Sequence, residues 1–318
     1  MRKFLYILCL GLLFTTCDDG DVFEVTLDFD DTFSQCGTLV FYKTNQSTSE
    51  SLSIKLPSLT LESPSDLPVN SQLESLLDVG EDHLYENTLP IGNTNVLNYR
   101  SYANLPADNL LFCNDIPPSN LGINKDEVSI GGEVYIRTVL VEDDNDGIPS
   151  ELEDLNGNGD YDDDDSDNDT IPNYLDADDD GDNVLTKTEL DTLNLDGDDN
   201  PLTNPKDTDE DGIPDYLDSD DDGDGVLTRD EENTNVNQNP TDDVSDPDAG
   251  VADYLNDQVS TTVTATAFRT HTIRMTYTIS VILSEISLPS ITQQTLDFGT
   301  LDDTSITSDT RTGTPVFN

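Results

Sequence analysis

Acidic side chains crowd into one stretch of this sequence, and their density limits the ways in which that stretch can pack. The chain of 318 residues contains 68 Asp and Glu against 13 Lys and Arg, which gives a formal net charge of -55. Residues 142–257 hold 43 of these acids and three basic residues. Such a segment either stays solvated or needs a counter-charge before it can collapse. The same charge excludes nucleic-acid binding, because no basic surface is available to contact phosphates.

The acidic segment contains an internal repeat. Residues 165–189 and 207–231 align without gaps and are identical at 17 of 25 positions, with a spacing of 42 residues. A repeat of this length indicates a structural unit that is used more than once. A disordered acidic linker is the alternative, but a linker requires neither turn residues at fixed offsets nor recurring apolar residues. We expect those apolar residues to form a small core: Ile171, Tyr174, Leu175, Ile213, Tyr216 and Leu217.

Within each copy the acids fall at alternate positions, as a calcium loop requires. A loop of twelve residues supplies oxygens from positions 1, 3, 5, 7 (a backbone carbonyl), 9 and 12, with a turn at position 6. Residues 178–189 and 220–231 fit at every position, with Asn183 and Gly225 at the turn. The predicted ligands are Asp178, Asp180, Asp182, Val184, Thr186 and Glu189 in one loop and Asp220, Asp222, Asp224, Val226, Thr228 and Glu231 in the other.

Related loops end in Asp, which reaches an ion less easily as a bidentate ligand than Glu does. Their predicted ligands are Asp165, Asp167, Asp169, Ile171 and Asp176, and then Asp207, Asp209, Asp211, Ile213, Asp215 and Asp218. Two weaker copies precede them, with Asp144 and Asp146 in residues 142–153 and Asp154, Asn156 and Asn158 in residues 154–165. The sequence therefore predicts several calcium ions without fixing their number.

The motif DxDxDGIPDxxD, present at residues 207–218 and followed closely by DxDxDG, resembles thrombospondin type 3 repeats. The resemblance spans residues 142–257 and implies calcium loops of the EF-hand type without paired helices, with calcium as a structural cofactor. Pro149, Pro172 and Pro214 stand at the eighth loop position, where an exiting helix would begin, and they disfavour such a helix.

The amino terminus has the layout of an export signal. Arg2 and Lys3 precede an apolar run that ends shortly before Cys17, and the run is too short to span a bilayer. The cysteine resembles the acylated residue of a bacterial lipobox, and the acids of residues 17–21 resemble the surface-export tether of Bacteroidota lipoproteins. We expect a signal peptide at residues 1–16, a lipid anchor at Cys17, and an outer-membrane lipoprotein exposed at the cell surface. Ordinary secretion, with Cys17 as a spare thiol, is the alternative.

The remaining cysteines form an even pair. Cys9 leaves with the signal and Cys17 takes the lipid, so Cys36 and Cys113 remain in an oxidising compartment, where a disulfide is expected. Two unpaired buried thiols are the alternative.

The flanks alternate polar and apolar residues with the period of β-strands. Strands are expected at 23–29, 38–43, 51–56, 96–102, 133–141, 262–269, 273–283 and 294–299. Several half-buried strands of this kind favour a mainly β chain with a β-sandwich body, interrupted by the irregular acidic insert. We assign residues 22–141 to the β domain and expect residues 258–318 to complete it, against the alternative of two separate β domains.

The sequence contains no catalytic or nucleotide-binding motif, and we expect no enzyme and no nucleotide cofactor. The two histidines, His83 and His271, are expected at the surface. The leading hypothesis is a calcium-binding surface lipoprotein whose repeats form a spacer or an adhesion module. One alternative gives the β domain an extracellular glycan or protein ligand, with calcium as structural support only. An enzyme with a carboxylate-based site in the β domain is the other alternative.

Overall fold

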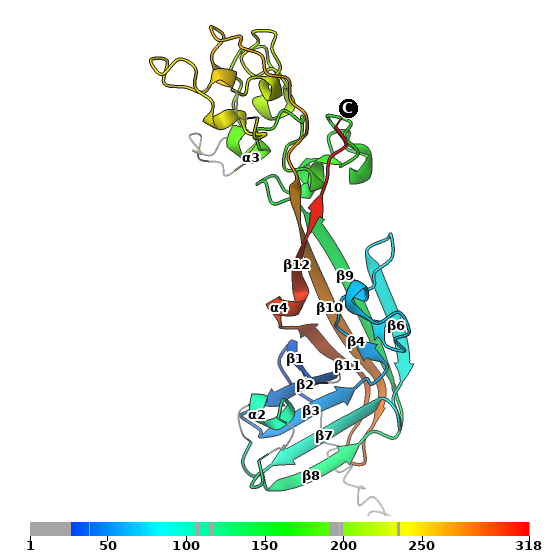
Figure 1. Cartoon of the computed structure of the whole chain (residues 1–318). Helices are drawn as coiled ribbons and strands as arrows, with labels where there is room; N and C mark the ends of the chain where they lie inside the picture. Colours follow the sequence, from blue (N-terminus) through cyan, green and yellow to red (C-terminus); the bar gives the residue numbers. More distant parts are fainter. Residues whose placement is uncertain are drawn as a thin grey trace, which may run out of the picture. The chain divides into compact units, whose positions relative to one another are not determined.

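The computed structural model describes residues 27–317, except 38, 106–107, 115–117, 191–196, 198–199 and 234–235. The predicted mainly β body is confirmed and consists of a large curled sheet (Figure 1). The predicted signal peptide, tether and lipidated Cys17 lie outside the described residues. No helix in the described part of the chain is both long and apolar enough to cross a membrane.

Ten strands of the described chain form the main sheet, in the order β6-β9-β10-β11-β1-β2-β3-β7-β8, with β12 paired to β10. The strands are β1 (Thr32–Cys36), β2 (Val40–Asn45), β3 (Glu50–Lys55), β6 (Leu84–Pro90), β7 (Val96–Tyr102), β8 (Ile123–Val128), β9 (Glu133–Asp143), β10 (His271–Ser287), β11 (Thr292–Leu301) and β12 (Ser308–Gly313). A separate short pair joins β4 (Leu59–Thr60) to β5 (Glu74–Ser75) in parallel.

Helices in the described chain are short. The α-helices are α2 (Asp108–Phe112), α3 (Thr186–Glu189) and α4 (Thr304–Thr307). Single turns of 3-10 helix lie at Pro64–Asp66, Ser150–Leu152, Tyr161–Asp163, Asn173–Leu175, Asp215–Leu217, Thr228–Asp230, Pro240–Asp242 and Asp253–Leu255. Five of these turns lie near the ends of the predicted acidic loops: Ser150–Leu152, Tyr161–Asp163, Asn173–Leu175, Asp215–Leu217 and Thr228–Asp230.

Two of the expected strands differ from the structure. Residues 262–269 do not form a strand, and Val263 makes only an isolated bridge to Glu231. Polar partners from the acidic segment hold this stretch instead, since Ala265 N–H donates to Asp230 and Arg269 N–H donates to Asn183. Most of the strand expected at 23–29 lies outside the described residues, and its described part is not a strand.

Chain contacts divide the molecule into two units, and the predicted domain boundaries remain predictions. The first unit consists of residues up to 57, residues 88–135 and residues 281–300. Its core is built around Phe33, whose ring lies 4.7 Å from that of Phe41 and 5.3 Å from that of Phe298, centroid to centroid. Burial of each such side chain contributes about 1.5 to 3 kcal/mol.

A disulfide joins Cys36, at the end of β1, to Cys113, just after α2. The two Cα atoms lie 5.2 Å apart across a sequence separation of 77 residues. The ring of Tyr42 stacks on that of Phe112 at 4.4 Å, so the short helix is fixed to β2 beside the bridge.

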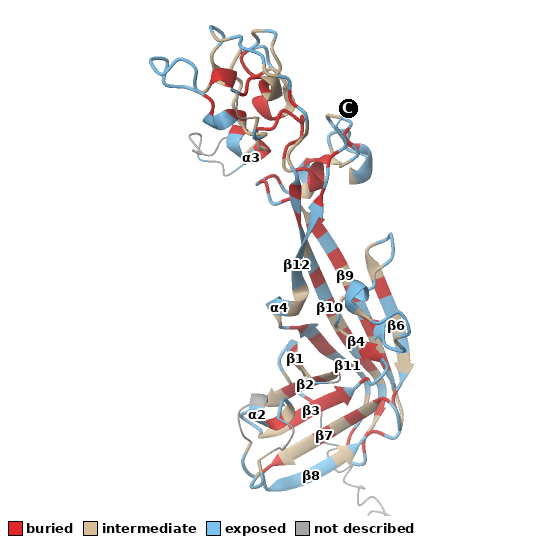
Figure 2. Ribbon diagram, viewed as in Figure 1, coloured by how far each residue is buried: buried red, intermediate tan, exposed pale blue. Residues whose placement is uncertain are grey.

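The second unit consists of residues 58–87, 136–280 and 301 onward, and it contains the acidic segment. Two small cores support the acidic loops, and buried residues recur along these loops in Figure 2. Tyr174, Leu175 and Ile273 form one core with Tyr161 and Ile171, while Ile148, Leu190 and Tyr216 form the other with Leu202 and Leu217. The predicted small core is thus confirmed, except that Ile213 is 46% exposed.

Candidate metal centres in the acidic segment

The sixth position of each acidic loop turns through positive φ, as the loop spacing requires. Asn183 has φ 70° and Gly225 has φ 91°, and both conformations are accessible to these residue types. Thr170 occupies the same position in the loop of residues 165–176, with φ 85°, although a β-branched residue is strained there.

Backbone N–H groups hold one oxygen of most loop carboxylates. In the loop of residues 178–189, the N–H of Asp182 donates to Asp180 Oδ1 at 3.2 Å and that of Val184 donates to Asp182 Oδ1 at 2.6 Å. The same two bonds recur in the loop of residues 220–231, from Asp224 to Asp222 at 3.1 Å and from Val226 to Asp224 at 2.8 Å. These bonds fix the carboxylates at alternate positions and leave their second oxygens free to converge.

The second oxygens have no hydrogen-bond partner within the described chain, although they are buried. They are Asp144 Oδ2, Asp146 Oδ2, Asp165 Oδ1, Asp167 Oδ2, Asp169 Oδ2, Asp180 Oδ2, Asp182 Oδ2, Asp207 Oδ1, Asp220 Oδ1, Asp222 Oδ2 and Asp224 Oδ2. Glu153, Glu189 and Glu231 stand at the twelfth loop positions, and both oxygens of each carboxylate are likewise buried without a hydrogen-bond partner in the described chain. A buried carboxylate oxygen without a donor is costly unless a cation binds it.

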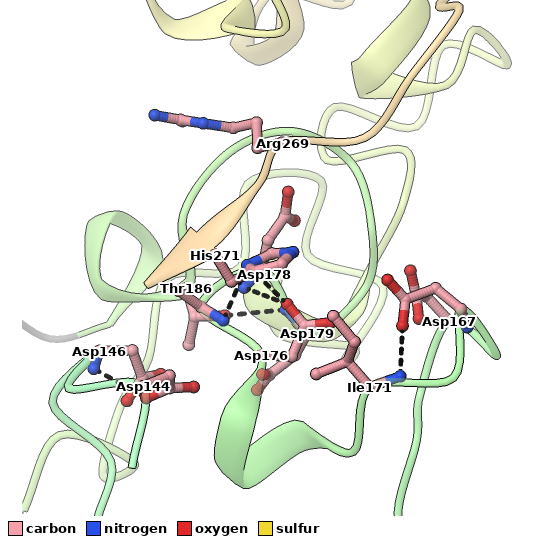
Figure 3. Close-up of polar contacts among 12 residues, drawn as sticks. Asp144, Asp146, Asp167, Ile171, Asp176, Asp178, Asp179, Thr186, Arg269 and His271 are labelled. Carbon is pink, nitrogen blue, oxygen red and sulfur yellow. Dashed lines mark hydrogen bonds and ion pairs between the residues drawn. The ribbon is translucent and has the colours of Figure 1, made fainter. Parts of the chain in front are cut away.

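Several of these carboxylates gather into groups whose potential ligand atoms all lie within 4.8 Å of one another. Three such groups are Asp178 with Asp180 and Asp182, Asp165 with Asp167 and Asp169, and Asp144 with Asp146, Glu153 and Asp179. A fourth combines Asp182 and Glu189 with Asp221. Most members are buried, and Figure 3 shows Asp144, Asp146 and Asp179 of the third group.

Sequence reasoning missed Asp179 and Asp221, because neither stands at an odd loop position. Each is the second acid of a DDDGD run and brings a carboxylate to an earlier loop: Asp179 to the loop of residues 142–153, and Asp221 to the loop of residues 178–189. Thr186 and Thr228 hold the backbone at these two acids, since their Oγ1 atoms accept the N–H of Asp179 at 3.1 Å and of Asp221 at 3.2 Å. The presence of the extra acid in both copies of the repeat was the available signal.

Burial and mutual repulsion raise the pKa values of these acids. Burial, followed by the charges of Asp146 and Glu153, raises the pKa of Asp144 to about 9. Burial, followed by the charge of Asp146, raises the pKa of Glu153 to about 9. Burial, and after it neighbouring carboxylates, raises the pKa values of Asp182 and Glu189 well above their usual range. Clustered acids whose pKa values are all raised favour the binding of a proton or a metal ion.

Other predicted ligands are already engaged by protein groups. Asp215 accepts the N–H of Thr208 at 2.7 Å and pairs with Lys206 Nζ at 2.7 Å. Asp178 accepts the N–H groups of Asp182 and Asn183 on its two oxygens. Asp154, Asn156 and Asn158 lie in an exposed loop in which they accept backbone N–H groups.

Most of the remaining predicted ligands lie in the loop of residues 207–218. Asp209 and Asp211 each accept one backbone N–H, as does Asp218 from Asp220. The backbone N–H groups of Ile171 and Ile213, at seventh positions, donate to Asp169 and Asp211. The loop of residues 207–218 is therefore formed but more open to solvent than its equivalent at residues 165–176.

His271 is buried at 3% exposure, so its expected surface position is wrong. It begins β10, and its Nδ1 accepts the N–H of Ala177 at 3.2 Å. The same atom lies 3.2 Å from Asp176 Oδ1, a contact shown in Figure 3. Burial, followed by the charge of Arg269, lowers the pKa of His271 to about 4.

Comparison with known proteins finds one family in this segment. Residues 143–200 match the family described as BamM C-terminal. No curated protein and no solved structure matches the chain. The match overturns the expected relationship to thrombospondin type 3 repeats, which is wrong. The misleading feature was the DxDxDG spacing, which is that of a calcium-loop ligand pattern and does not by itself identify a family.

Proposed function

We propose that the acidic segment binds several calcium ions and folds stably only with them. The observation that carries this proposal is the arrangement of carboxylates such as Asp182 and Asp224: one oxygen accepts a backbone N–H, and the other is buried without a donor in the described chain. Calcium takes six to eight oxygen ligands in flexible geometry, which suits converging carboxylates, carbonyls and water.

Protons alone are a poorer explanation of the clusters. Asp144, Asp146, Glu153 and Asp179 bring four carboxylates within 4.8 Å, whereas one shared proton neutralises a single charge. Near-millimolar calcium, at the affinity typical of extracellular modules, stabilises each site by about 0.4 to 1.4 kcal/mol. Several calcium sites along the segment are therefore needed to stabilise it, and the repeat provides several loops.

We place this segment in an outer-membrane-associated lipoprotein. The match to the BamM C-terminal family, an outer-membrane assembly lipoprotein domain, supports that location. The export-signal layout before Cys17 supports it independently. The match also favours protein partners in outer-membrane protein assembly over an adhesive role, with the calcium segment as a stiff support for the β body.

Calcium titration of the full chain tests the central proposal. Calorimetry is expected to show several equivalents bound at about millimolar calcium, and hydrogen exchange is expected to slow across residues 142–257. The double variant Glu189→Gln/Glu231→Gln is expected to lose part of this binding. The matched control Glu151→Gln/Asp257→Asn removes two exposed charges of the same segment and is expected to bind as the unmodified chain does. Absence of calcium heat and unchanged exchange would refute the proposal.

Membrane placement has its own test. Cys17→Ser is expected to release the exported protein from the membrane fraction, since the proposed lipid anchor is attached through this thiol and each of its buried CH₂ groups contributes about 0.8 kcal/mol to membrane binding. Retention of the variant in membranes would contradict the lipid anchor and leave the calcium result untouched.

A further inference from the structure

One cluster of the acidic segment differs from the others because it includes a nitrogen ligand. Asp169, Asp176 and His271 each present one potential ligand atom, and the three atoms lie within 4.8 Å of one another. Asp169 and Asp176 are each 1% exposed. The two acids come from the loop of residues 165–176, whereas His271 arrives from the start of β10.

The polar atoms of this cluster are incompletely satisfied by protein groups. Asp169 uses Oδ1 to accept the N–H of Ile171 at 2.7 Å, while its buried Oδ2 has no partner in the described chain. Nδ1 of His271 accepts the Ala177 N–H at 3.2 Å, so it carries no proton, and a metal ion bound there would take its single lone pair in place of that N–H. Asp176 Oδ1 accepts the Asp178 N–H at 2.9 Å and keeps a second lone pair. The Nδ1 atom lies 3.2 Å from Asp176 Oδ1, and two acceptor atoms at this distance need a proton or a cation between them.

The spacing and the donor types indicate the class of ion. First-row metal ions bind imidazole nitrogen and carboxylate oxygen at about 2.0 to 2.2 Å, which sets neighbouring ligands about 3.0 to 3.5 Å apart. The observed 3.2 Å between His271 Nδ1 and Asp176 Oδ1 falls in that interval. Imidazole suits zinc and related transition metals, while calcium is bound by oxygen.

We propose that Asp169, Asp176 and His271 form a site for a first-row transition-metal ion of the zinc class. The site shares Asp169 and Asp176 with the loop of residues 165–176, and it goes beyond the proposed calcium function because an imidazole ties the first residue of β10 to that loop. Three protein ligands leave at least one coordination position for water or a further carboxylate. The competing account is a protonated Asp176 that donates to His271 Nδ1 with no metal.

The chain contains two histidines, so nitrogen resonances of the imidazoles report the site directly. The full chain, labelled with ¹⁵N-histidine, is titrated with zinc in the absence of calcium and again at about millimolar calcium. One zinc equivalent is expected to shift Nδ1 of His271 strongly in both conditions and to leave His83 unchanged. An unshifted His271 signal at saturating zinc would overturn the proposal and favour the competing account, in which a protonated Asp176 donates to His271 Nδ1.

Variants give a second measurement. His271→Gln is expected to weaken zinc binding at least about tenfold, as loss of a ligand does, while the calcium titration stays unchanged. His83→Gln, which changes the half-exposed histidine near Glu142, is the matched control and is expected to bind zinc normally. Unchanged zinc affinity in His271→Gln would overturn the assignment. If the chain binds no calcium but zinc shifts the His271 signal, only the calcium proposal is refuted, so the two proposals can be tested separately.

Discussion

The neutral substitution Asp221→Asn is expected to change stability in opposite directions with and without calcium. Asp221 is 1% exposed, and its ligand atom lies within 4.8 Å of those of Asp182 and Glu189. At 4.8 Å and an effective dielectric of 20, each pair of ionised carboxylates costs about 3.5 kcal/mol. Protonation limits this cost. Burial is the main cause that raises the pKa of Asp221 to about 8, so the folded chain holds this proton at pH 7, whereas the unfolded chain, with a pKa of 3.8, does not. Taking up the proton lowers the free energy of unfolding by about 4 kcal/mol.

In chelator, Asp221→Asn removes that cost and places an amide donor beside Glu189, so we expect a gain of about 1 to 4 kcal/mol. With calcium, the same change deletes a charged ligand, and a tenfold loss of affinity costs about 1.4 kcal/mol. Urea denaturation, followed by hydrogen exchange to resolve the acidic segment from the sheet, measures both states.

Asp257→Asn is the matched control, because Asp257 is an exposed acid of the same segment. It is expected to change stability by no more than about 0.5 kcal/mol in either condition. Two outcomes would refute the reasoning: destabilisation by Asp221→Asn in chelator, or a calcium response equal to that of the unmodified chain. Either is expected if the Asp221 carboxylate serves only as a hydrogen-bond acceptor.

Three further predictions concern the backbone, pH and the disulfide. Thr170→Gly is expected to stabilise the calcium-loaded chain by about 1 kcal/mol in thermal melts, because φ 85° strains a β-branched residue; a lower melting temperature would contradict this. In chelator, the folded pKa values of Asp144 and Glu153, about 9 each, exceed the unfolded values of 3.8 and 4.5, so the folded state holds more protons between about pH 4 and 9. Stability without calcium is therefore expected to fall as pH rises through that window, whereas calcium affinity rises, and denaturation and titration across pH measure the two trends. Removal of the bridge by Cys36→Ser/Cys113→Ser is expected to cost up to about 4 kcal/mol in urea denaturation, with the reduced unmodified chain as the comparison and equal stability as the contrary result.

Much of the fold was predictable because its signals are local. The alternation that predicts a strand at residues 273–283 reflects a face that is buried in β10, where Ile279, Val281 and Leu283 are fully buried. Strand β8 escaped prediction because its side chains are mostly exposed and show no alternation. Residues 262–269 were misassigned because Thr and Val alternate there, while bonds to Asp230 and Asn183 decide their conformation.

The loop carboxylates were predictable for the same reason, and the residues that join the loops were not. Spacing within twelve residues fixes which oxygens converge, as the bonds around Asp180 and Asp182 illustrate. Asp221 lies 32 residues beyond Glu189, and nothing in the local spacing indicates that their carboxylates meet. His271 was misplaced at the surface because its neighbours come from a loop far away in the sequence.

The equivalent positions of Asp179 and Asp221 make the proposed ions dependent on one another. Asp179 belongs to the loop of residues 178–189 but joins the carboxylate group of the loop of residues 142–153, and Asp221, of the loop of residues 220–231, joins the group of the loop of residues 178–189. An ion bound in either group would therefore fix the backbone of a later loop as well as its own. Since ordering each residue costs about 1 to 2 kcal/mol, a loop already ordered by its neighbour binds its own ion more tightly. Calcium binding along the segment should consequently be cooperative, and Asp221→Asn should lower that cooperativity as well as the affinity.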